Sequence, residues 1–210
     1  MIIGVCGLIG AGKDTVADYL VNVHEFRRDS FAATLKDAVS AVFGWDRDML
    51  EGRTKSSREW REQVDPWWSQ RLGIPDLTPR WILQRWGTET LRHGFHDDVW
   101  IASLENKLRN SLDDVVISDC RFPNEIESIR RSGGLVVRVI RGQDPEWFVS
   151  AQQHLRHGLD LPKEMPHSSE WSWAATEFDH VIDNNGSMDD LYRTINDLVQ
   201  YLRAAKAGQA

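Results

Sequence analysis

A segment near the start of the chain has residue types and spacing suited to binding phosphate. Gly7-Leu8-Ile9-Gly10-Ala11-Gly12-Lys13-Asp14-Thr15 fits the pattern G-x-x-x-x-G-K, in which glycines let successive backbone N–H groups surround phosphate oxygens. Lys13 can reach the β- and γ-phosphates, and a helix after the loop directs its positive end toward them. The alternative is a glycine-rich turn with an incidental lysine, which the apolar run before the loop and the helical pattern after it disfavour. A dinucleotide site is excluded because the glycines do not follow G-x-G-x-x-G.

Asp14 stands where this pattern usually has Ser or Thr, and Thr15 comes one place later. A carboxylate here can bind Mg²⁺ directly or through water, while Thr15 bonds a phosphate oxygen. The alternative is that Asp14 only caps the N-terminus of the following helix. The sequence leaves both interpretations open.

A second carboxylate and an arginine follow a later apolar run. Asp119 closes Val115-Val116-Ile117-Ser118-Asp119 as the acidic residue of a Walker-B strand does, and a parallel sheet would bring it beside the phosphate loop. We therefore expect Asp14, Thr15 and Asp119 around Mg²⁺. Arg121 would point into the same crevice and clamp a phosphate with its guanidinium fork, or else form a surface pair with Glu125. Lys13, Arg121 and Asp119 are the predicted catalytic residues.

The elements that must position these residues are strands alternating with helices. Apolar, β-branched runs predict strands at residues 2–6, 115–119, 135–140 and 181–183, and helical spacing predicts helices at residues 16–23, 123–131 and 188–205. This alternation predicts an α/β fold of the P-loop NTPase type, with a parallel sheet flanked by helices.

Two segments depart from the alternating pattern. Residues 32–112 have helical patterns, such as Leu35, Val39 and Val42 on one face, and predict a helical insertion. Residues 142–176 contain prolines and histidines with weak periodicity and predict a mobile lid. We expect residues 1–210 to form one kinase domain that carries both segments.

The amino-acid composition argues against several classes of protein. The chain has 210 residues, 41% of them hydrophobic and 27% charged, with a net charge of −7, which disfavours disorder and nucleic-acid binding. Cys6 and Cys120 are too few for a disulfide framework, and two packed thiols are expected. Neither a signal peptide nor a membrane-spanning run is evident, so we expect a cytoplasmic protein, in a host cell if the source is viral, and a homodimer is compatible with the sequence.

Several motifs together resemble those of bacteriophage deoxynucleoside monophosphate kinases. They are Gly-Lys-Asp-Thr at 12–15, Ser-Phe-Ala at 30–32, Leu-Gln-Arg-Trp-Gly-Thr-Glu at 83–89, Ser-Asp-Cys-Arg-Phe-Pro-Asn-Glu at 118–125, and His-Ser-Ser-Glu at 167–170. The resemblance spans most of the chain. It implies a P-loop kinase that moves the γ-phosphoryl group of ATP onto a deoxynucleoside monophosphate, with Mg²⁺ and a closing lid.

The chemistry of two anionic nucleotides also requires cations and a flat apolar wall for a base. Arg141 is expected at the ATP, beside the loop residues Gly7, Gly10, Ala11, Gly12, Lys13, Asp14 and Thr15. The residues expected at the acceptor are Phe31, Lys36, Gln84, Arg85, Trp86, Glu89, Arg92, Trp100 and Arg121.

Three alternatives remain. Another small-molecule P-loop kinase, such as one acting on dephospho-coenzyme A, would share the phosphate loop and differ in its acceptor. A nucleotide-hydrolysing switch should carry the motif N-K-x-D, but the most similar segment is Asn106-Lys107-Leu108-Arg109, which lacks the Asp. A motor protein usually has Glu directly after the strand-end Asp, where this chain has Cys120. A binding module would need no basic crevice.

Overall fold

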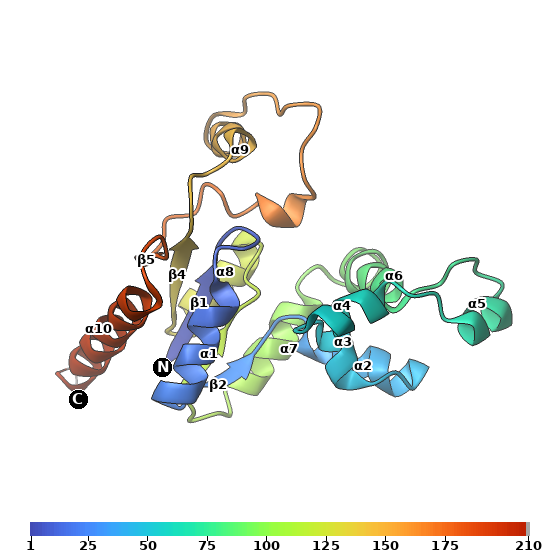
Figure 1. Cartoon of the computed structure of the whole chain (residues 1–210), viewed down its shortest axis with the longest axis horizontal. Coiled ribbons are helices and arrows are strands. Elements are labelled where there is room, and N and C mark those ends of the chain that lie inside the picture. The colour runs from blue at the N-terminus through green and yellow to red at the C-terminus, as the bar shows by residue number, and fades with distance from the viewer. Residues whose placement is uncertain (209–210) are drawn as a thin grey trace. The chain divides into compact units, whose positions relative to one another are not determined.

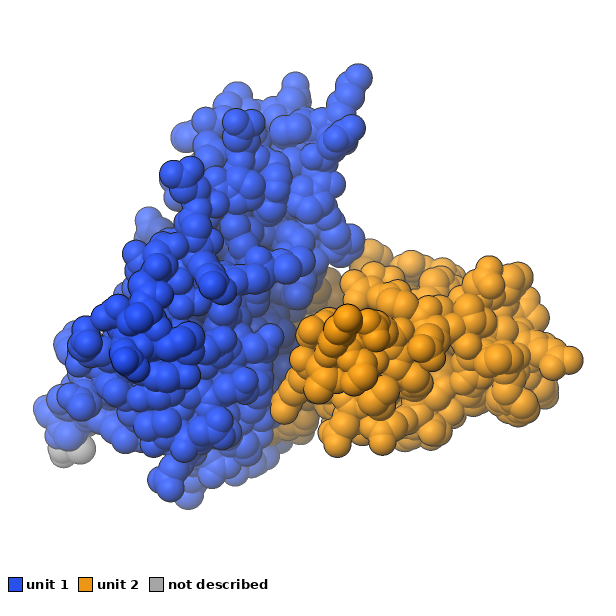
Figure 2. Space-filling view, viewed as in Figure 1, with its two compact units in different colours: residues 1–30, 108–210 blue, residues 31–107 orange. Residues whose placement is uncertain are grey.

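The computed structural model describes residues 1–208 and divides the chain into two compact units. One unit joins Met1–Ser30 to the chain from Leu108 onward, and the other is Phe31–Lys107. Figure 2 colours the two units separately. Within residues 1–208, no helix has both the length and the apolar character needed to cross a membrane.

The first unit is built on a five-stranded sheet with the order β2-β3-β1-β4-β5. All four strand pairs are parallel. The chain enters at β1, turns to β2 and β3 on one side of it, and crosses to β4 and β5 on the other. The carboxyl end of β1 is thus the point where the strand order reverses, which is where open α/β sheets bind ligands. The strands are β1 (Ile2–Cys6), β2 (Arg27–Asp29), β3 (Val115–Ile117), β4 (Leu135–Ile140) and β5 (His180–Asp183).

Helices cover both faces of this sheet (Figure 1). Alternate residues of β1, Ile3 and Val5, are fully buried in a core with α1 and α10. On the opposite face α8 lies so close to β1 that a Cβ on Gly4 would meet Ile129 at 2.6 Å. The helices of this unit are α1 (Lys13–His24), α8 (Pro123–Arg131), α9 (Glu146–His157), the short 3₁₀ segment η2 (Ser168–Glu170) and α10 (Met188–Ala207).

The second unit is helical throughout its ordered elements and has its own aromatic core. Phe43 stacks on Trp45 with ring centroids 4.5 Å apart, and Leu50 and Leu77 are fully buried beside them. Its elements are α2 (Ala33–Phe43), α3 (Arg47–Glu51), α4 (Lys55–Arg61), α5 (Pro66–Leu72), α6 (Pro79–Gln84), the π-helix η1 (Arg85–His93) and α7 (Val99–Leu108), whose last residue belongs to the first unit.

The structure confirms the predicted α/β class with a parallel sheet. It also corrects several details. The strand expected at residues 115–119 ends at Ile117, because the chain leaves the sheet before Asp119. Val42 was predicted on the apolar face of its helix but is 55% exposed, and Phe43 is buried instead. The helical insertion was predicted to extend to residue 112, but its last helix, α7, ends at Leu108.

Candidate active site

The phosphate loop connects β1 to α1 and depends on a glycine at its last position. Gly12 has a φ of 102°, a left-handed conformation that glycine adopts most easily. A Cβ there would also lie 2.4 Å from the side-chain nitrogen of Asn184. That same amide nitrogen donates to the carbonyl oxygen of Ala11 at 2.9 Å. Asn184, the residue that follows β5, therefore fixes the backbone of the loop where it enters α1.

Lys13 is folded over its own loop. Its Nζ donates to the carbonyl oxygens of Gly7 at 2.8 Å and of Leu8 at 2.9 Å. Burial lowers the pKa of Lys13 below its ordinary value, and the positive charge of Arg121 lowers it further. An anion such as a phosphoryl group bound near Lys13 would offset this repulsion between the two positive charges.

Asp14 does not cap the helix. The N-cap residue of α1 is Gly12, and the Asp14 carboxylate, which is 81% exposed, accepts a hydrogen bond from Arg28 on β2. Thr15 follows in the first turn of α1. The carboxylate is thus at the helix N-terminus, where a metal ion bound to phosphates could reach it.

Asp119 lies at the carboxyl edge of the sheet, half-buried, two residues beyond β3. The parallel pairing of β3 with β1 ends at Gly4 and Ile117, so Asp119 lies beyond the paired residues. The Cys6 thiol at the end of β1 donates to the carbonyl oxygen of Cys120 at 3.3 Å. This hydrogen bond holds Cys120, and with it the adjacent residue Asp119, near the start of the phosphate loop.

Arg121 pairs with an acidic residue far along the chain. Its guanidinium donates to Glu170 at 2.5 Å and to the Ser169 hydroxyl at 3.4 Å. The alternative considered for Arg121 was a surface pair with Glu125; Glu125 is buried, and its carboxylate accepts the backbone N–H of Arg121 at 2.8 Å. The charge of Arg121 lowers the pKa of Lys13, and the opposite charge of Glu170 partly offsets this effect.

Arg141 directly follows β4 and is exposed. The next residue, Gly142, donates its backbone N–H to Asn185 at 2.7 Å. Asn185 in turn donates to Asp183 at 2.7 Å. The turns after β4 and β5 are therefore linked to each other at the edge of the sheet that carries the phosphate loop.

The residues predicted at the acceptor fall mostly in the second unit, around the π-helix η1. Arg85 pairs with Glu89 four residues later, and both are more than half exposed. Trp100 is 8% exposed and donates its indole N–H to the carbonyl oxygen of Gly87 at 2.9 Å. Segments of π-helix are frequent at functional sites because they change the direction of side chains within a helix. The other predicted residues there are exposed Gln84, half-buried Trp86 and Arg92, and buried Phe31.

Lys36 lies elsewhere in the second unit, in an ionic network. Its Nζ pairs with Glu51 at 2.9 Å, and Arg47 contacts the other oxygen of the same carboxylate at 2.5 Å. Burial raises the pKa of Glu51, but the two cations outweigh it and lower the value to about 2. Lys36 is thus held by a carboxylate that stays ionised across the physiological pH range.

Sequence reasoning missed three residues at the phosphate loop. Arg28 lies on a short polar strand that has no apolar pattern, Asn184 directly follows β5, and Glu170 ends the His-Ser-Ser-Glu motif, to which no role was assigned. Their partners are distant in sequence, so only the motifs themselves could have drawn attention to them.

We expect both cysteines to resist thiol reagents in the folded protein. Burial raises the pKa of Cys6 to about 12 and that of Cys120 well above its ordinary value, and neither residue is more than 1% exposed. At pH 8 this lowers the reactive thiolate fraction of Cys6 roughly a thousandfold relative to a free thiol. Titration with a disulfide reagent should label neither thiol in buffer and both in denaturant, whereas rapid labelling of the native protein would contradict the packing.

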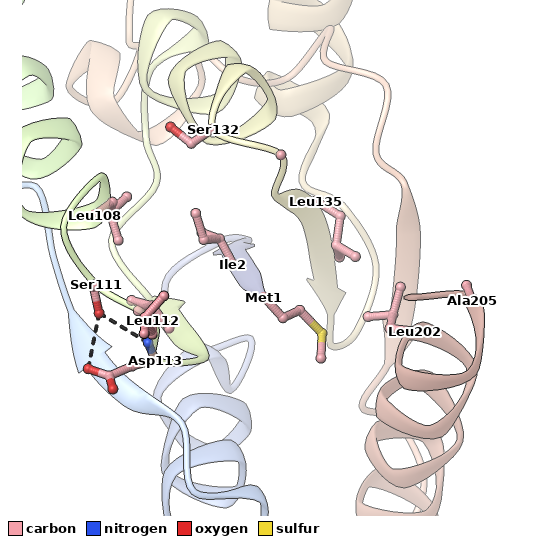
Figure 3. Close-up of a pocket in the computed structure, with 12 residues that line it drawn as sticks. Met1, Ile2, Leu108, Ser111, Leu112, Asp113, Ser132, Leu135, Leu202 and Ala205 are labelled. Carbon is pink, nitrogen blue, oxygen red and sulfur yellow. Dashed lines mark hydrogen bonds between the residues drawn. The ribbon is translucent and has the colours of Figure 1, made fainter. Parts of the chain in front are cut away.

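A separate pocket of about 520 Å³ lies at the opposite edge of the sheet (Figure 3). It is lined by the amino ends of β1, β3 and β4, including Ile2, Val115 and Leu135, together with Leu202 of α10. Since the phosphate loop follows the carboxyl end of β1, this pocket is not part of the phosphate site.

The residues present at the loop fit a magnesium ion. Within residues 1–208 no group of three or more His, Cys, Asp or Glu side chains could hold a metal. Mg²⁺ in phosphoryl-transfer sites needs only one or two carboxylates, because phosphate oxygens and waters supply its other ligands. Asp14, exposed beside Lys13, and Asp119 at the neighbouring strand end have the required oxygen chemistry.

Two viral proteins are similar to this chain in sequence. The chain is 30% identical over 209 residues, 93% of this chain and 94% of the other, to a protein of Acanthamoeba polyphaga mimivirus described as a deoxynucleotide monophosphate kinase. It is 29% identical to the deoxynucleoside-5'-monophosphate kinase of Escherichia phage T5, over 64% of this chain and 74% of the other.

No protein-family model matches the chain. Among solved structures, a dephospho-CoA kinase from Campylobacter jejuni is 15% identical with a TM-score of 0.40, covering 95% of this chain and 96% of the other. The mimivirus relative matches 93% of this chain at 30% identity. The chain therefore belongs to the deoxynucleoside monophosphate kinases, and it is a P-loop phosphotransferase.

Proposed function

We propose that this enzyme transfers the γ-phosphoryl group of ATP to deoxynucleoside monophosphates and forms the corresponding diphosphates. The observation that carries the proposal is the phosphate loop between β1 and α1, on whose carbonyl oxygens Lys13 rests, with the charge of Arg121 acting on that lysine. The similarity to viral enzymes described as acting on deoxynucleotides supports the acceptor class.

The donor is ATP, bound with its phosphates in the loop of residues 7–15. Gly7, Gly10, Ala11 and Gly12 present backbone N–H groups, and Lys13 leaves its loop carbonyls to contact the β- and γ-phosphates. Arg141, exposed after β4, covers the nucleotide from the neighbouring strand end.

The acceptor supplies its own nucleophile. The second pKa of a phosphate monoester is about 6, so an acceptor oxygen is anionic at neutral pH and needs no general base. This oxygen forms a bond to the γ-phosphorus while the bond from that phosphorus to the β–γ bridging oxygen breaks, and ADP leaves. Arg121 neutralises the charge on the transferred group. A Mg²⁺ ion held by Asp14, Thr15 and Asp119 would supply further positive charge at the phosphate oxygens.

The acceptor base and phosphate are bound by the insertion of residues 32–112, and residues 142–176 act as the lid. The cluster of polar and aromatic side chains on and around η1 supports this assignment. The residues that we assign to the acceptor are Phe31, Lys36, Gln84, Arg85, Trp86, Glu89, Arg92, Trp100 and Arg121.

A coupled assay of ADP release tests the proposal. The enzyme is mixed with ATP and Mg²⁺ and with each member of a panel of deoxy- and ribonucleoside monophosphates, with dephospho-coenzyme A and water alone as further acceptors. We expect rapid release with one or more deoxynucleoside monophosphates and slow release with water. Release that depends only on dephospho-coenzyme A would assign a different acceptor, and equal release with water alone would indicate a hydrolase.

A further inference from the structure

Arg28 joins the first turns of α1 to the end of β3. It lies on β2, where it pairs in register with Val116, and its side chain is only 14% exposed. The guanidinium donates to Asp18 at 2.6 Å, to the Ser118 hydroxyl at 2.9 and 3.2 Å, and to Asp14. All three of its nitrogens are therefore engaged, two of them by carboxylates of the helix that follows the phosphate loop.

These contacts offset the negative charge of two carboxylates near the phosphate loop. Asp14 directly follows Lys13, so its negative charge would oppose a polyphosphate bound at the same helix end. Asp18 lies one helical turn further along, on the same side of α1, and adds a second negative charge. Arg28 is the cation that meets both carboxylates, and it contacts Ser118, the residue before Asp119.

We propose that Arg28 is a positioning residue, which holds the Asp14 carboxylate against the end of β3 and neutralises it, and so sets how the loop binds ATP with and without a divalent cation. The inference rests on the proposed function, because it assumes ATP in the loop. If the contacts of Arg28 served only the stability of the fold, removing them would leave the dependence of ATP affinity on Mg²⁺ unchanged.

Calorimetric titration of ATP into the intact protein, once in EDTA and once in excess Mg²⁺, measures this dependence directly and does not require turnover. In Arg28→Gln the released Asp14 carboxylate repels metal-free ATP, so its affinity should fall about tenfold, the size expected for one charge several Å from the phosphates at a partly exposed site. Affinity in Mg²⁺ should fall less, because a divalent cation held by the Asp14 carboxylate would offset the negative charge of that carboxylate. The ratio of the two affinities should therefore rise several-fold.

Two further variants separate charge from packing. The double variant Arg28→Gln with Asp14→Asn removes both charges, and its affinity ratio should return toward that of the wild type. The matched control is Arg27→Gln on the same strand, since Arg27 pairs with Asp29 at 2.7 Å and Asp113 at 3.1 Å, away from the loop. This control should leave the ratio unchanged.

The results of these titrations distinguish a failure of the role of Arg28 from a failure of the proposed ATP binding. An unchanged ratio in Arg28→Gln, or no recovery in the double variant, would overturn the role of Arg28 while leaving the kinase assignment intact. Wild-type protein that binds no ATP under either condition would instead refute the proposed donor, and the inference with it. If Arg28→Gln does not fold, Asp14→Asn alone provides the test, because Arg28 would then be balanced only by Asp18 and the loss of one negative charge should tighten the binding of metal-free ATP.

Discussion

Replacing Lys13 by Ala should lower kcat/KM for ATP by about a thousandfold, equivalent to about 4 kcal/mol of lost transition-state stabilisation. The ammonium group is held at the loop by two backbone carbonyls, 2.8 and 2.9 Å away, in a half-buried position where charge is only weakly screened by water. Steady-state kinetics of ADP release with varied ATP would measure the loss.

The fold should survive this change, because the two carbonyls that lose their donor can bond water instead. Thermal unfolding should therefore shift little in Lys13→Ala. Lys55→Ala is the control, since Lys55 is 86% exposed and its closest acidic partner, Glu59, is 3.7 Å away. Retention of more than about a tenth of the wild-type kcat/KM by Lys13→Ala would refute the role of this lysine.

The pH dependence of the wild type gives a second measure of the same group. Because burial and Arg121 both lower the pKa of Lys13, the ammonium loses its proton at a lower pH than an ordinary lysine does. The plot of kcat/KM for ATP against pH reports the free enzyme. It should decline on its alkaline side below pH 10.5, the ordinary value for lysine.

Arg121→Ala should lower kcat by about a hundredfold to a thousandfold, with a smaller change in KM for ATP. The guanidinium lies close enough to Lys13 to lower the pKa of that lysine, and it is 42% exposed beside the phosphate loop. Its stabilising effect should be greatest when negative charge spreads over the transferred phosphoryl group. Single-turnover measurements with saturating ATP and acceptor would isolate this step.

The geometry also predicts how related variants rank. Arg121→Lys should recover only part of the activity, because an ammonium cannot reproduce the two-pronged contact of a guanidinium with phosphate oxygens. Glu170→Gln should alter kcat much less than Arg121→Ala, since Arg121 itself remains. Arg193→Ala on α10 is the control, because Arg193 is 69% exposed and pairs only locally with Asp190 at 3.0 Å. Equal activity of Arg121→Ala and the wild type would remove Arg121 from the mechanism.

The sequence determined features that depend on short, regular spacing. The phosphate loop, β1, β4 and α10 were predicted close to their observed bounds, because apolar periodicity and the loop glycines act between near neighbours. The acidic residue and the arginine that follow β3 were identified in the same way. The family was also evident from local motifs, and the viral relative confirmed it.

Weak local patterns account for the elements that were missed. β2 consists of Arg27, Arg28 and Asp29, and a charged strand of this kind forms only because β3 offers it hydrogen-bonding partners. The segment expected to be a mobile lid contains α9, which packs Phe148 under the guanidinium of Arg138 at 4.7 Å. β2 has no apolar pattern within its own three residues, whereas α9 has Phe148 and Ala151 at helical spacing and Gly158 as its C-cap, which the prediction of a lid did not use.

Only the tertiary structure decided which charges meet at the loop. Arg28 reaches Asp14 across 14 residues, Arg121 reaches Glu170 across 49, and Asn184 reaches Ala11 across 173. Such contacts form because the parallel sheet brings the carboxyl ends of distant strands to one edge, where Arg28 and Arg121 meet carboxylates and Asn184 meets a loop carbonyl. The spacing of residues along the chain does not indicate these long-range contacts. The sequence therefore predicted the candidate chemical groups, and the fold determined which residues they contact.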